Sequence, residues 1–120
     1  MLTIRREQLD VLAQTRREAF IDRLVAQLRK HWTSECEALE SDALRERVGD
    51  AIDRAAKYEL RAEVDVARYV NVTLALGPAF DEDPCYPWAR AILEEEAFTA
   101  GKKVERLCAL TAEALSKREA

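Results

Sequence analysis

The sequence predicts an all-helical protein, a compact bundle of about five helices with a long N-terminal helix, forming a single domain over residues 1–120. Three observations predict it. Glycine and proline are rare, with three of each. The residues that fill the chain are Ala, Leu, Glu and Arg, which lose little entropy in a helix. Apolar side chains recur at three- and four-residue steps, and 48% apolar against 35% charged residues suits one core with a solvated surface.

The N-terminal segment is predicted to be one long amphipathic helix, or two in line. Arg16 and Arg17 interrupt its apolar stripe, which allows a bend near Thr15. Beyond it, Ser34 and Glu37 have the spacing of a capping box and predict a short helical turn. The stripe consists of Leu9, Leu12, Phe20, Leu24, Leu28 and Trp32.

The next helix is expected to begin at Ser41 or Asp42 and to end over 58–60. One of its faces is apolar. On the opposite face Asp50 and Arg54 are four residues apart, a spacing that supports an exposed helix through an ion pair.

The segment 64–76 is rich in β-branched residues, which would suit a strand. Helix is favoured for two reasons: a lone strand would have no partner, and Gly77 followed by Pro78 is a common helix stop. The segment also carries a stripe at helical spacing, formed by Val66, Tyr69, Val70, Thr73 and Leu76.

Residues 78–87 form a proline-rich, acidic loop. Pro87 suits the first turn of the helix that follows and runs through 93. The chain breaks again over 98–101, where Thr99 is a candidate cap, and the last helix carries a supportive pair between Glu113 and Lys117.

The residues indicate no catalytic, cofactor-binding or metal site. His31 is the only histidine and has no glycine-flanked nucleophile. The run 81–83 is acidic, but Pro84 breaks the spacing of a calcium loop. The cysteines, which are odd in number and widely spaced, predict reduced thiols. An enzyme whose site is built from carboxylates on facing helices remains a third hypothesis for the function, after the two binding functions given below. The single histidine cannot supply the two Glu-x-x-His pairs of a di-iron site.

Charge and hydropathy limit the partners. The net charge of −4 disfavours nucleic acid. No stretch is long and apolar enough for a membrane span, and the opening Met1–Glu7 lacks the apolar core of a signal peptide, so a cytoplasmic protein is expected. The first 33 residues are net basic and 34–83 net acidic, an asymmetry that could steer a protein partner or stagger a homodimer.

The loop 78–87 is the segment we single out for partner binding. Its candidate contact residues are Asp81, Glu82, Asp83 and Tyr86, three carboxylates and a tyrosine. Phe80 and Trp88 are expected to anchor the loop inside the fold, with Tyr86 at the surface.

Most of the sequence resembles a pattern in small, uncharacterised bacterial proteins associated with type VI secretion and with PAAR-like or toxin-containing gene neighbourhoods. The resemblance is carried by Ala67-Arg68-Tyr69-Val70, by Leu76-Gly77-Pro78-Ala79-Phe80-Asp81-Glu82-Asp83-Pro84, by Pro87-Trp88-Ala89, and by Leu2-Thr3-Ile4-Arg5 with Gln8-Leu9 at the start. It implies an accessory, adaptor or chaperone-like protein that binds a secreted protein or a secretion component, and it transfers no residue as functional.

Two functions follow as hypotheses. The first is a non-enzymatic accessory protein of bacterial type VI secretion or effector delivery, acting through a helical face or the loop 78–87. The alternative is an immunity protein that neutralises a cognate toxin with an acidic surface. The acidic middle of the chain fits both.

Overall fold

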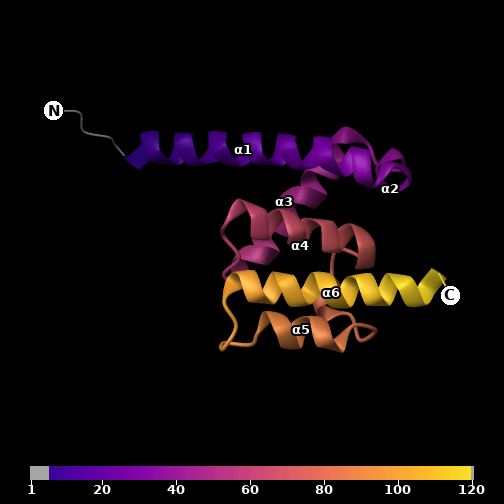
Figure 1. Ribbon diagram of the computed structural model, residues 1–120. Helices are drawn as coiled ribbons and strands as arrows, with labels where there is room; N and C mark the ends of the chain where they lie inside the picture. Colours follow the sequence, from indigo (N-terminus) through magenta and orange to yellow (C-terminus); the bar gives the residue numbers. More distant parts are fainter. Residues whose placement is uncertain (1–5, 120) are drawn as a thin grey trace. The chain divides into compact units, whose positions relative to one another are not determined.

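The computed structural model describes residues 6–119, and the side chains of 11–118. Over these residues the chain is all-α, with six α-helices, one 3-10 turn and no strand (Figure 1), so the predicted fold class is confirmed. The sequence pattern Leu2–Arg5 and the side chains of Gln8 and Leu9 lie outside this description. In chain order the elements are α1 (Arg6–His31), α2 (Thr33–Glu37), α3 (Ser41–Lys57), α4 (Glu63–Leu76), η1 (Phe80–Glu82), α5 (Pro87–Leu93) and α6 (Ala100–Glu119).

The chain divides into two compact units, Met1–Arg45 and Glu46–Ala120, with the boundary inside α3. The single domain over 1–120 stays a prediction.

In the first unit, α1 is one continuous helix, the first of the two predicted alternatives, but its buried stripe differs from the predicted one. Ile21, Leu24 and Leu28 are buried, three and four residues apart. Leu12, a member of the predicted stripe, is 51% exposed, and Val11 beside it is exposed as well. Periodicity indicates which face of a helix is apolar, but how far along the helix that face is covered depends on what packs against it.

The predicted capping box at the start of α2 does not form. Trp32 occupies the N-cap position and makes no side-chain cap bond. The hydroxyl of Thr33 donates instead to the carbonyl oxygens of Arg29 at 3.1 Å and Lys30 at 3.3 Å. Because α2 begins two residues after α1 ends, a hydroxyl at this junction serves the last carbonyls of α1.

In the second unit, α4 confirms the helical interpretation of 64–76. All five residues of its predicted stripe are buried, and so are Val72 and Leu74. Gly77 ends the helix with a φ of 112°, while its amide donates to the carbonyl of Thr73 at 2.9 Å. Glycine is required here because L side chains rarely adopt that conformation.

The C-terminal helix α6 lies between α4 and α5 and packs against both (Figure 1). Val104, Leu107 and Thr111 lie on its buried face. Thr99 caps the helix as expected, since its hydroxyl accepts the amide of Lys102 at 3.2 Å. Within residues 6–119, no helix has the length and apolarity that crossing a membrane requires.

Candidate functional site

The loop 78–87 is fixed to the second unit by a buried carboxylate. Asp81, in η1, is 4% exposed. Its Oδ1 accepts from Arg54 Nη1 at 2.6 Å, and its Oδ2 accepts from the Tyr58 hydroxyl at 2.6 Å. The guanidinium of Arg54 therefore binds the loop, whereas the sequence predicted a pair with Asp50 along the surface of α3. A buried carboxylate needs such partners because an uncompensated charge is costly to desolvate.

Aromatic rings surround this carboxylate. The Tyr69 ring centroid lies 5.1 Å from that of Phe80 and 6.5 Å from that of Tyr58. Burial raises the pKa of Tyr58, and the hydrogen bond to Asp81 raises it further. Burial and then the charge of Asp81 likewise raise the pKa of Tyr69, whose buried hydroxyl has no hydrogen-bond partner among the described residues. Both tyrosines are thus held neutral beside the carboxylate.

The structure separates the four candidate contact residues. Asp81 is committed to the buried pair with Arg54, and Glu82 is exposed with one carboxylate oxygen 3.8 Å from Arg54 Nη2. Asp83 is half-buried, and its Oδ1 accepts the amide of Cys85 at 2.9 Å, a turn-type bond. Tyr86 is only 7% exposed. Their part in partner binding stays a prediction, although the side chains of two of them face inward.

Two expectations about aromatic side chains were wrong. Tyr86 was expected at the surface but is buried, because its hydroxyl accepts from Arg118 and its ring is covered by the same guanidinium, 5.7 Å from the ring centroid. Trp88 was expected inside but is only half-buried. Phe80 is fully buried, as expected.

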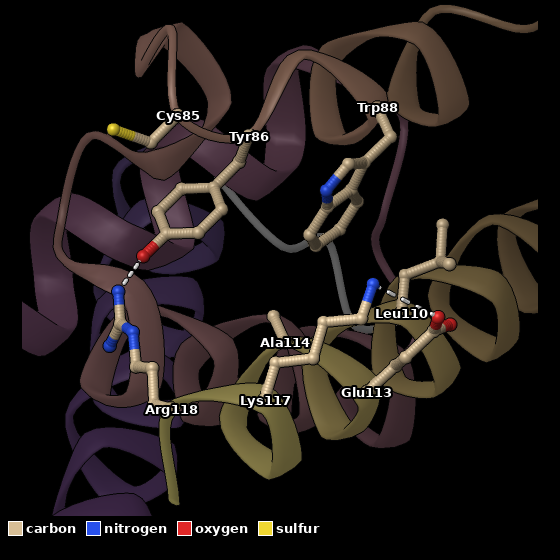
Figure 2. Close-up of a pocket in the computed structure, with 8 residues that line it drawn as sticks. All are labelled: Cys85, Tyr86, Trp88, Leu110, Glu113, Ala114, Lys117 and Arg118. Atoms are coloured by element: carbon tan, nitrogen blue, oxygen red, sulfur yellow. Dashed lines mark hydrogen bonds and ion pairs between the residues drawn. The ribbon is translucent and has the colours of Figure 1, made fainter. Parts of the chain in front are cut away.

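Trp88 is half-buried because it forms one wall of an open pocket of about 330 Å³. Figure 2 shows the pocket between the start of α5 and the last turns of α6, with the indole pointing into it and the Cys85 thiol pointing away. The ring centroids of Tyr86 and Trp88 are 5.9 Å apart, in an edge-to-face arrangement. The α6 side is lined by Leu110, Glu113, Ala114, Lys117 and Arg118.

The charged groups of this pocket lie on α6. Glu113 and Lys117 pair at 3.5 Å, which confirms the predicted helix-surface pair. Arg118 holds the hydroxyl of Tyr86. Its half-exposed apolar residues are Trp88, Leu110 and Ala114, so the pocket combines an apolar floor with a charged rim. Such a combination suits binding through a buried apolar anchor.

The pocket is poorly suited to covalent chemistry. A hydrogen bond to Asp83 and the charge of its carboxylate raise the pKa of the Cys85 thiol, whereas a nucleophilic cysteine needs a lowered one. His31 is an exposed residue at the end of α1. Among the described residues, no group of three or more His, Cys, Asp or Glu side chains is placed to hold a metal ion.

The sequence reasoning missed the residues that complete both features. Arg54 was predicted to pair on the surface of its helix and Tyr69 to lie in the apolar stripe of the next one, while Tyr58 and Arg118 were not singled out. The α6 wall does carry a signal, because its residues follow the spacing of one helix face. That signal alone does not say whether the face is covered.

Comparison of the chain with protein-family models, curated proteins and solved structures yields no match. We therefore argue function from the side chains of the pocket.

Proposed function

We propose that this chain is a non-enzymatic accessory protein, adaptor- or chaperone-like, that binds a protein partner. The observation that carries the proposal is the pocket lined by Tyr86 and Trp88. Tryptophan, tyrosine and arginine are the residues most enriched among interface hot spots, and all three lie here beside an apolar floor.

The openness of the pocket favours a protein segment over a small molecule. Sites for small ligands are concave and bury most of the ligand surface. Here Cys85, Glu113, Lys117 and Arg118 are exposed, and Trp88 is half-exposed, so a small ligand would remain largely in water. A polypeptide inserts one side chain and covers the rim with its neighbours.

The cellular setting that we propose is bacterial type VI secretion or effector delivery, in the cytoplasm, on the sequence resemblance alone. The partner would be a secreted effector or a secretion component. Neutralisation of a cognate toxin remains the alternative, favoured by the excess of carboxylates over 34–83.

Photo-crosslinking from inside the pocket tests the proposal. A photoreactive phenylalanine replaces Leu110 in the full chain, and a second version carries it at Ala56, an exposed residue of α3 that does not line the pocket. We expect a discrete protein adduct in native cells from position 110 only. The captured protein is then purified and mixed with the unlabelled chain, and a defined complex is expected on size-exclusion chromatography.

Two variants decide whether that complex uses the pocket. Trp88→Ala should weaken it at least about thirtyfold, since a hot-spot truncation costs at least about 2 kcal/mol. Trp32→Ala, which removes the other half-buried tryptophan, should leave the affinity unchanged. Equal affinities for both variants, each shown by circular dichroism to be folded, would contradict the proposal. Rescue of cells that express a toxin partner would select the immunity role.

A further inference from the structure

The guanidinium of Arg118 carries a charge that its neighbours do not neutralise. It donates to the hydroxyl of Tyr86 and lies 5.7 Å from the centroid of that ring. Among the side chains that the structure describes, no carboxylate lies within ion-pair distance of it. The carboxylate of Glu113, the acidic residue of the pocket, is paired with Lys117 at 3.5 Å.

This cation lies beside an apolar surface that is only half covered. Trp88, Leu110 and Ala114 line the pocket and are each half-exposed. An apolar side chain placed on them would remove apolar surface from water on both sides of the contact, which favours binding. Figure 2 places the guanidinium on the Tyr86 side of the same pocket and the indole on the other side, so an apolar group on Trp88 and an anion at Arg118 would come from neighbouring residues of one bound segment.

The backbone around the pocket offers little to a free chain terminus. Capture of a terminal carboxylate commonly uses a nest of unoccupied backbone amides. Here the Cys85 amide donates to Asp83 Oδ1 at 2.9 Å and the Tyr86 amide to the Asp83 carbonyl at 3.0 Å. Pro87 has no amide hydrogen. The planar fork of Arg118 therefore remains for an anion, and it matches a side-chain carboxylate.

We infer that the pocket binds an internal segment of the partner in which a large apolar residue stands next to Asp or Glu. The apolar side chain packs on Trp88 and Leu110, and the carboxylate binds Arg118. This inference rests on the proposed function, because it names the kind of partner segment that the same pocket takes.

Peptide titration tests it. The protein is the full chain with Trp32→Phe, so that Trp88 is the only tryptophan and its fluorescence reports on the pocket. The probes are acetylated and amidated heptapeptides that contain either Phe-Asp or Phe-Asn at the centre. We expect the Phe-Asp peptide to bind at least about tenfold more tightly. A hydrogen bond between two charged groups is stronger than one with a neutral partner, and the difference corresponds to roughly that factor in the dissociation constant. Raising the salt concentration should shrink the difference.

Matched variants assign the difference to one side chain. Arg118→Gln should bring the two peptides to within about twofold of each other. Arg106→Gln removes the same charge from an exposed position of α6 outside the pocket and should preserve the preference. Circular dichroism checks that both are folded. If Arg118→Gln fails to fold, the inference is judged on the parent protein, from the ratio of its affinities for the Phe-Asp and Phe-Asn peptides and from the dependence of that ratio on salt.

Three results would overturn the inference: no binding of either peptide up to about 1 mM, equal affinity for both, or tighter binding of an otherwise identical peptide that ends in a free phenylalanine carboxylate. The crosslink at position 110 is read independently. A partner that crosslinks there while the peptides fail would leave the proposed function standing and reject only this segment chemistry.

Discussion

Replacing the buried carboxylate of the loop should destabilise the protein more than any other change to its acidic run. In Asp81→Asn one acceptor oxygen remains, while two donors, Arg54 and the Tyr58 hydroxyl, compete for it. The substitution also leaves the guanidinium without the charge that faced it at 2.6 Å. Burial lowers the pKa of Arg54, but Asp81 and then Glu82 outweigh this and raise it, which shows that the two charges stabilise each other.

The size of the effect follows from burial. Breaking a buried ion pair by removing one partner costs about 3–5 kcal/mol. The side chain of Arg54 is 29% exposed, so water partly replaces the lost partner, and we expect the free energy of unfolding to fall by about 2–3 kcal/mol for Asp81→Asn. Glu82→Gln removes an exposed carboxylate 3.8 Å from the same guanidinium and should change the free energy of unfolding by no more than about 0.5 kcal/mol.

Urea unfolding followed by circular dichroism measures both variants. The free energy of unfolding of a small protein typically falls by about 1–3 kcal/mol per molar urea, so Asp81→Asn should lower the midpoint by about 0.7–3 M. The double variant Asp81→Leu with Arg54→Met removes both charges and should be less destabilised than the sum of its single variants. If Asp81→Asn and Glu82→Gln have the same midpoint, the buried carboxylate does not anchor the loop and our reasoning is refuted.

Three further predictions concern other groups. Because the folded-state pKa of Tyr58 is raised, its contribution to stability is complete below the unfolded value of about 10 and is lost as pH rises above it; the urea midpoint should fall between pH 9 and 11, and Tyr58→Phe should reduce that fall. The exposed Cys85 thiol should be alkylated before the other two cysteines, and faster in Asp83→Asn, which lowers its pKa, as a pH–rate profile would show. Gly77→Ala should cost about 1 kcal/mol or more through its φ of 112°, while Gly101→Ala in the helical α6 should stabilise by up to about 1 kcal/mol; thermal unfolding that ranks the two variants in reverse would refute the argument.

The loop 78–87 thus links the two structural features of the second unit. Asp81 fixes one end of it to Arg54, and Tyr86 at the other end forms a wall of the pocket. A variant of Asp81 that remains folded should therefore also weaken partner binding, since it loosens the segment that carries Tyr86.

Local sequence determined the helices. The stripe of 66–76, the stop at Gly77, the proline that opens α5 and the hydroxyl cap of Thr99 all act within a few residues, so periodicity and residue chemistry suffice to predict them. The fold class follows from the same local signals.

Only the tertiary structure decided which polar and aromatic side chains are buried. Asp81 meets Arg54 across 27 residues of chain, and Arg118 meets Tyr86 across 32. Contacts at such separations depend on how helices pack, and the period of a helix holds no information about its neighbours. For that reason the sequence predicted Asp81 as a contact residue although it is buried and anchors the loop. Tyr86 is buried although it was expected at the surface, and Trp88 is only half-buried although it was expected inside.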